Sequence, residues 1–340
     1  MQNAISGFKA KERNMSKITR RQFGALAAGA ASLIMTSTAH AAWKPAGTVK
    51  VIVPFAPGGA TDVLARIVSE RLTQIWGQPV VIENVAGATG AVGATQVARA
   101  TPDGLTLFVG TGSVNSALPS VKSDLTFDTL RDFKAVSLLA TFPNVLVVRT
   151  DIAAKSVPEL ITLLKSKKGG ANFASSGFGS SIHLAGELFK LQTQTEMTHV
   201  PYKGSAPALA DLLAGHVDLM FDNLTNVMPH IETGKVRALG VAGAKRTPYL
   251  PNVPAIAEFV PNFEATTWVG FLAPVGTPQE IVDLIAADCD QVLREASVVE
   301  RVKKLAAEPV GGAPTQFATF LKADVERWKK VVKDANLKVE

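Results

Sequence analysis

The stretch VIVPFAPGGATDVLAR at residues 51–66 predicts a strand, a glycine turn and a helix in direct succession. Residues 49–55 form a short β-branched run, which favours a buried strand. The Pro-Gly-Gly at residues 57–59 interrupts that pattern. Apolar residues then recur at helical spacing, at Leu64, Ile67, Val68, Leu72 and Ile75. The stretch therefore opens a βα unit.

The same alternation continues along the chain. After the first helix, strands are expected at residues 79–83 and 105–110, with a helix between a glycine turn at Gly87 and Ala100. Later helices at residues 157–167, 180–191 and 207–214 alternate with strands at 171–175, 196–201 and 217–222, and another strand ends at Val241. Such alternation predicts parallel strands with helices on both faces.

Two long extended runs, residues 135–148 and 263–274, look like crossings between two halves. A capping box at residues 277–280 opens a further helix, and the last helix carries a stripe of Phe317, Phe320, Leu321, Trp328 and Val332. We predict a two-lobed α/β fold with two crossover strands and the C-terminal helices returning to the first lobe. The first lobe would comprise residues 42–142 plus 269–340, and the second residues 143–268. A cleft between the lobes is the expected ligand site.

The N-terminus reads as an export signal. Arg20 and Arg21 precede an uncharged run at residues 24–39 and an Ala-His-Ala cleavage signal ending at Ala41. The paired arginines favour the twin-arginine route to the periplasm, with residues 1–41 removed and either Met1 or Met15 as the start. A basic tail on a cytosolic protein is the alternative. The signal contains six of the 35 basic residues and one of the 29 acidic residues, so the remainder is nearly neutral and gives no support for nucleic-acid binding.

Motifs for catalysis, metals and cofactors are missing. The sequence has no Gly-x-Ser-x-Gly, Walker loop, His-Glu-x-x-His or cysteine cluster, and its one cysteine, Cys289, falls in an apolar helical pattern. The glycines at 87, 90 and 93 lack both the dinucleotide spacing and the acid at the end of the next strand. We therefore expect no catalytic residue, metal or cofactor. Among the histidines only His183 lies beside a Gly/Ser-rich turn, where it either contacts ligand or caps the turn.

Two turns suit an anion. The first, residues 54–62, joins a strand to a helix start, and residues 175–181 do the same in the second half. Glycines there let backbone N–H groups approach a ligand, and a helix start adds partial positive charge. Each turn alone is equally an ordinary capped turn, and two dipoles of about 1 kcal/mol each fall short of the roughly 8 kcal/mol that micromolar binding needs. Directed hydrogen bonds and apolar contacts must supply the remainder.

Ordered motifs then give a family resemblance. VIVPFAPGGATDVLAR, GQPVVIEN, TPDGLTLFVGT, FPNVLVV, NFASSGFGSSIHLAGELF, HVPYKGSAPALADLLAGHVDLMFDN and FEATTWVGFLAPVGTP together resemble the Bug-type receptors, which are solute-binding components of tripartite tricarboxylate transporters. The match runs from about Pro45 to Leu337. The resemblance implies a flytrap of the periplasmic binding-protein type, similar to type II, that closes on a carboxylate. Known relatives bind amino acids, citrate-like acids or aromatic carboxylates.

The resemblance also implies a set of ligand-binding residues, in which backbone amides, hydroxyls and waters hold the carboxylate. Phe178 stands where the family commonly has a small polar residue, which would suit a less polar or aromatic ligand. With His183 added, the candidates are Phe55, Ala56, Gly58, Gly59, Asp62, Gly110, Thr111, Ser176, Phe178, Gly179, Ser180, Ser181, His183, Tyr202, Phe221 and Asp222.

We therefore expect a monomeric periplasmic receptor that passes a carboxylate to membrane permease subunits. One alternative is a periplasmic enzyme on the same scaffold, with Asp62, His183 or Asp222 in acid–base roles. Another is a ligand sensor that signals to a membrane kinase.

Overall fold

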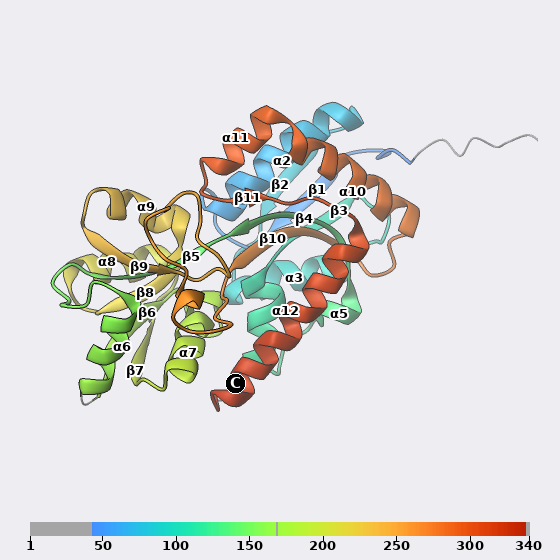
Figure 1. The fold of residues 1–340 in the computed structure, drawn as a ribbon. Helices are drawn as coiled ribbons and strands as arrows, with labels where there is room; N and C mark the ends of the chain where they lie inside the picture. Colours follow the sequence, from blue (N-terminus) through green and yellow to red (C-terminus); the bar gives the residue numbers. More distant parts are fainter. Residues whose placement is uncertain (1–42, 168, 338–340) are drawn as a thin grey trace, which may run out of the picture. The chain divides into compact units, whose positions relative to one another are not determined.

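The computed structural model describes residues 43–167 and 169–337 (Figure 1). The predicted export signal, with its arginine pair and cleavage site, lies outside these described residues. Within them no helix has both the length and the apolar character needed to cross a membrane.

A six-stranded sheet has the order β11-β4-β10-β3-β1-β2. Strand β1 (Val49–Val53) pairs in parallel with β2 (Val80–Asn84) and β3 (Thr106–Thr111), as the alternating pattern predicted. Val51 and Val53 enter the core on one face while Ile52 enters the core on the other, which is why β1 reads as a continuous apolar run. Antiparallel β10 (Thr267–Pro274), β4 (Phe133–Phe142) and the short β11 (Glu308–Pro309) complete the sheet.

Helices cover both faces of this sheet. The core on one face receives α2 (Ala60–Trp76), α10 (Gln279–Arg294) and α11 (Ala296–Lys303), and Cys289 is buried there as predicted. The other face receives α3 (Ala91–Ala98) and the first half of α12 (Pro314–Asp334). The short elements of this lobe are η1 (Ala88–Gly90), the π-helical turn η2 (Gly112–Ala117), α4 (Leu118–Val121) and α5 (Thr129–Asp132).

A five-stranded sheet has the order β7-β6-β8-β5-β9. Strand β6 (Ala171–Ser175) pairs in parallel with β7 (Met197–Pro201) and β8 (Leu219–Asn223). Antiparallel to β8 runs β5 (Asn144–Arg149), which also pairs with β9 (Val236–Val241). The helices of this lobe are α6 (Val157–Ser166), α7 (Ser181–Thr193), α8 (Ser205–Ala214), α9 (Leu224–Glu232) and the short η3 (Ile256–Glu258).

The chain changes sheets twice, in the two extended runs that the sequence marked as crossings. Between β4 and β5 stands Pro143, which has no N–H to donate to either ladder. The return occurs between β9 and β10, and the buried Asn144 amide donates to the Ala265 carbonyl oxygen at 2.6 Å, joining the two crossings. The prediction of a two-lobed α/β fold with two crossovers is confirmed.

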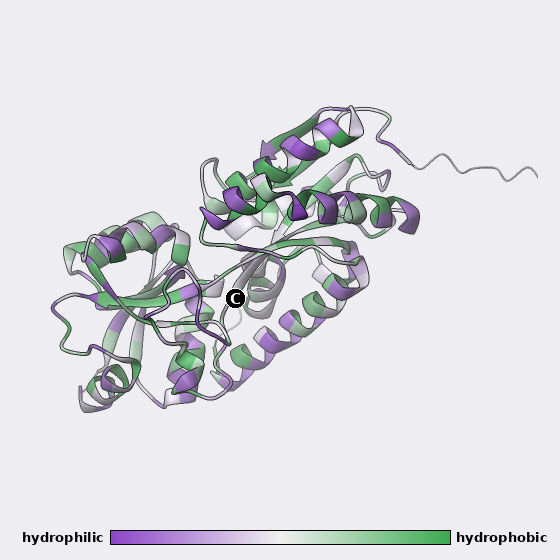
Figure 2. Ribbon diagram, turned by 45° about the horizontal axis from the view of Figure 1, so that its top comes forward, coloured by the Kyte–Doolittle hydropathy of each residue, from purple (hydrophilic) through white to green (hydrophobic). Residues whose placement is uncertain are grey.

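Helix α12 was expected only to return to the first lobe, but it packs on both sheets. Phe317, Leu321 and Val325 enter a core of the six-stranded sheet, whereas Trp328 and Val332 enter a core of the five-stranded sheet. Figure 2 shows the mixture of apolar and polar positions along this helix. One apolar stripe thus serves both lobes, which a helical spacing by itself does not reveal.

Candidate functional site

The two lobes place equivalent turns at the carboxyl ends of their parallel strands. Three strands in the order β2-β1-β3 match three in the order β7-β6-β8. In both lobes the central strand leads through a glycine turn into the N-terminus of a helix, α2 or α7. Ligands of open α/β sheets bind at this edge. We name residues 54–59 the α2 turn and residues 176–180 the α7 turn.

An ionic brace built on the buried Asp62 shapes the α2 turn. Gly58 adopts a left-handed φ of 90°, and its N–H donates to Asp62 Oδ2 at 2.9 Å. Arg66 donates to both carboxylate oxygens of Asp62 at 3.0 Å. The Asn84 amide donates to Asp62 Oδ1 and to the Phe55 carbonyl oxygen, each at 2.9 Å. Asp62 is 2% exposed, so it supports the turn from within and leaves no free oxygen for a ligand.

The brace leaves the start of α2 open. Gly58 and Gly59 are exposed, and Ala60 and Thr61 are half-buried. Among the residues that the structure describes, no acceptor is bonded to the backbone N–H of Ala60, Thr61 or Asp62. Burial raises the pKa of the Asp62 carboxyl, but its bonds to Arg66, Gly58 and Asn84 bring it below its usual value. These three donors at a helix start can bind an anion.

Neutral groups brace the α7 turn instead. Gly177 and Gly179 have left-handed φ values of 133° and 73°. Ser180 caps the helix, since its Oγ accepts from His183 N at 3.2 Å and donates to the Gly177 carbonyl at 2.8 Å. Gly179 N donates to His183 Nδ1 at 3.2 Å, and Gly177 N donates to Ser175 Oγ at 3.1 Å. His183 is therefore a capping residue of this turn.

His183 belongs to a buried aromatic stack that holds Phe178. The His183 ring lies 3.9 Å from the His199 ring and 5.0 Å from the half-buried Phe178 ring, centroid to centroid. His199 Nε2 lies 2.6 Å from Ser175 Oγ. Burial lowers the pKa of His183 to about 3 and that of His199 to about 4, helped by the charge of Lys190. Both imidazoles are thus neutral at physiological pH.

A side chain from the first lobe reaches the start of α7. Ser113, in the π-helical turn after β3, accepts from the backbone N–H of Ser181 at 3.2 Å, and its Oγ lies 2.9 Å from Ser181 Oγ. Sequence reasoning selected the neighbouring Gly110 and Thr111 but missed Ser113. Only their adjacency to Ser113 could have suggested it, because no local motif marks a serine that bonds across lobes.

The remaining candidates are buried or half-buried. Gly110 is required by packing, since a Cβ there would meet Leu272 Cδ1 at 2.6 Å. Thr111 is buried and its hydroxyl accepts from Val114 N. Ser176 is half-buried in the α7 turn, and Tyr202 donates its hydroxyl to Asp211 at 2.6 Å.

Two candidates on β8 are fully buried. Phe221 packs in the second-lobe core, with its ring centroid 5.9 Å from that of Phe189. Asp222 accepts from the Ser205 hydroxyl, the Asn226 amide and the Asn223 N–H, but from no cation among the described residues. Burial raises the pKa of Asp222 to about 6. Both residues can serve the site only as supports in this conformation.

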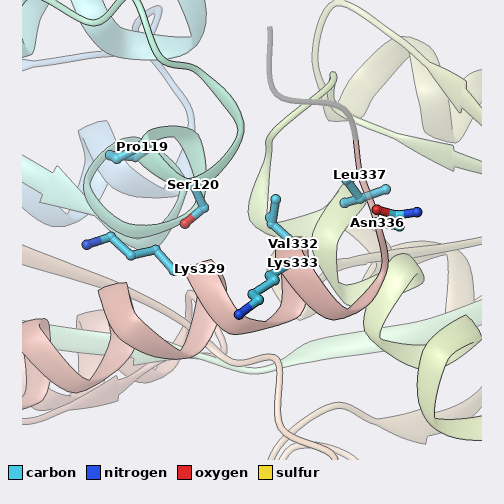
Figure 3. A pocket seen from close by; sticks show the side chains of 7 residues that line it. All are labelled: Pro119, Ser120, Lys329, Val332, Lys333, Asn336 and Leu337. Carbon is cyan, nitrogen blue, oxygen red and sulfur yellow. The ribbon is translucent and has the colours of Figure 1, made fainter.

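Neither of two further cavities is lined by residues of these turns. One of about 340 Å³, between α4 and the end of α12, is lined by residues that include Ser120, Lys329 and Lys333 (Figure 3). Another of about 220 Å³ lies beside Thr267, Asp324 and Arg327. Within the described part of the chain, no three His, Cys, Asp or Glu side chains gather as metal ligands.

Comparisons with known proteins agree on one family. The sequence profile described as "Tripartite tricarboxylate transporter family receptor" matches residues 64–337. The UPF0065 protein in the tcbD-tcbE intergenic region of Pseudomonas sp. strain P51 is 40% identical over 332 residues, covering 95% of this chain and 97% of that protein. Protein BugT of Bordetella pertussis is 37% identical over 298 residues, covering 87% and 91%.

Solved structures are similar over the same range. An R. palustris protein with adipate is 39% identical with a TM-score of 0.79, covering 86% of this chain and 98% of that one. MatC from Rhodopseudomonas palustris with bound malate is 36% identical with a TM-score of 0.76, covering 85% and 99%.

Proposed function

Because the chain belongs to the tripartite tricarboxylate transporter receptor family, we propose that it captures a small carboxylate in the periplasm and delivers it to the transporter's permease. The resemblance to Bug-type receptors is confirmed by this membership and by the similarity to BugT. Export by the twin-arginine route and a monomeric state are part of the proposal. Adipate and malate accompany two similar structures, which supports a carboxylate as the ligand class.

The observation that carries the proposal is the open start of α2. Three adjacent backbone donors, on Ala60, Thr61 and Asp62, converge where a 17-residue helix begins, next to exposed glycines. A carboxylate there gains charge-assisted hydrogen bonds, which are about twice as strong as neutral ones. Because Arg66 neutralises Asp62 from the other side, the buried carboxylate does not repel the ligand strongly.

The placement of the acid–base candidates supports a receptor rather than an enzyme. A general acid or base must reach the reacting group and titrate near the working pH. Asp62 and His183 are both at most 2% exposed, and their hydrogen bonds hold turns together. Asp222 is fully buried beneath the starts of α8 and α9.

Isothermal titration of the mature protein with a panel of aliphatic and aromatic carboxylates tests the function. We expect micromolar or tighter binding of at least one acid, with no chemical change in the recovered ligand by mass spectrometry. Silence across the panel, together with no carboxylate released from the freshly purified protein on denaturation, would refute the proposal. Turnover of a bound acid would instead establish the enzyme.

A further inference from the structure

The two helix starts at the site differ in how many backbone donors they offer. At α7, Ser113 takes the Ser181 N–H and Ser180 takes the His183 N–H, which leaves only the Ile182 N–H of the first three amides without an acceptor among the described residues. The amide of Gly179, just before the helix, is bonded to His183 Nδ1. At α2, by contrast, the first three amides have no acceptor among residues 43–167 and 169–337.

The cap on α7 comes from the opposite lobe. Ser113 lies two residues after the end of β3, whereas Ser181 is the first residue of α7. Its hydroxyl oxygen, at 3.2 Å from Ser181 N, stands where an oxygen of a ligand carboxylate would have to lie to use that amide. Val121 also packs closely against the α7 turn, since a Cβ built at Gly179 would lie 2.5 Å from its Cγ2.

Resting on the proposed function, we infer that Ser113 is a specificity residue that restricts the site to ligands with a single carboxylate, held at α2, and an apolar body facing Phe178. Ser113 acts by occupying the first α7 amide, so that a second carboxylate would find only the single N–H of Ile182 there. The half-buried Phe178 ring offers apolar contact in the same turn.

The charges around the α7 turn also disfavour a second carboxylate. The two imidazoles behind Phe178 are held neutral by burial, and Lys190 is paired with Glu187 at 2.8 Å. A second carboxylate would therefore lose its hydration without gaining a cation or the Ser181 N–H. A buried charged group without enough partners costs more than a neutral one, so we expect at least about tenfold discrimination.

Hexanoate and adipate form the test pair, because both have six carbons and differ only in the second carboxylate. Titration calorimetry of the mature protein should give a dissociation constant for hexanoate at least about tenfold below that for adipate. Ser113→Ala frees the Ser181 N–H and should reduce this ratio by about fivefold or more, mainly by improving adipate binding.

Two variants control for folding and for the lost hydroxyl. Ser166→Ala removes an exposed hydroxyl at the end of α6, which bonds only to the Leu163 carbonyl of its own helix, so the ratio should stay near that of the unmodified protein. Ser113→Thr keeps an acceptor oxygen and should restore the ratio. Thermal denaturation of each variant shows whether it is folded under the titration conditions.

The outcomes separate the inference from the function it rests on. If adipate binds as tightly as hexanoate and Ser113→Ala leaves the ratio unchanged, the inference is wrong while the carboxylate receptor stands. If neither these two acids nor any other carboxylate of the panel binds, the proposed function fails and takes the inference with it.

Discussion

The α2 turn and the α7 turn occupy the same place in two sheets of matching strand order, yet different chemistry holds them. A charged brace of Asp62 and Arg66 supports the α2 turn from behind. His183 and the hydroxyls of Ser175 and Ser180 support the α7 turn by accepting from amides of the turn and of the helix start. The α2 brace uses the Gly58 amide but leaves the first three amides of its helix free, whereas Ser113 and Ser180 use two of the first three amides of α7. Equivalent topology therefore does not imply equivalent function.

Lowering the pH should destabilise the second lobe, and this is the largest effect that we expect. Burial lowers the pKa values of His183 and His199 to about 3 and 4, while unfolded histidines titrate near 6.5. The folded state thus takes up fewer protons than the unfolded state, and the stability that is present above pH 6.5 is lost as pH falls toward 4. Urea unfolding at pH 7, 5 and 4 should show a loss on the order of several kcal/mol.

A matched variant locates that loss. His199→Gln keeps a hydrogen-bonding group beside Ser175 but removes one titrating imidazole. Its free energy of unfolding should depend less steeply on pH than that of the unmodified protein. Identical slopes would mean that other groups cause the acid sensitivity.

The next largest effect is expected when the ionic brace of the first lobe is removed. Asp62→Ala leaves the Gly58 N–H and the Asn84 amide without their acceptor and frees Arg66. We expect a loss of only about 2 kcal/mol in unfolding free energy, because Arg66 is half exposed and the pair is only partly desolvated. Carboxylate binding should weaken at least about tenfold, because the α2 turn loses the bonds that hold its shape. Glu70 lies on the same helix as Asp62 and forms an exposed ion pair with Arg301 of α11, so Glu70→Ala should change neither quantity by a comparable amount.

Asp222 sharpens the contrast between the lobes, because this buried carboxyl has no cationic partner among the described residues, unlike Asp62. Burial raises its folded pKa to about 6, from an ordinary value of 3.8. Its contribution to stability is therefore present below pH 4 and lost as pH rises through 6. Asp222→Asn, which can still accept from Asn223 N and Asn226, should be about 1–2 kcal/mol more stable than the unmodified protein at pH 8 and closely similar at pH 4. A stability difference independent of pH would contradict this titration.

The sequence predicted the strands and both glycine turns because β-branched runs and glycines are local signals. It could not predict how the turns are used. Asp62 was selected as a ligand contact, and its bonds to Gly58 and Asn84 depend on strand β2 being its neighbour in space. Ser113 was not selected at all, because its contact with Ser181 spans 68 residues and two lobes. Phe221 shows the same limit, since β8 turns that ring into the core.

The smallest expected effect is at Gly59 in the α2 turn, and Gly179 in the α7 turn is its matched comparison. A Cβ at Gly59, where φ is −74°, would meet nothing within 4 Å, so Gly59→Ala should change the unfolding free energy by no more than about 0.5 kcal/mol. A Cβ at Gly179, where φ is 73°, would lie 2.5 Å from Val121, so Gly179→Ala should cost about 1–3 kcal/mol. Chemical unfolding of both variants at pH 7 measures the difference. The α2 turn has room for a methyl group, whereas the α7 turn packs against Val121. Equal costs at Gly59 and Gly179 would therefore contradict this difference between the two turns.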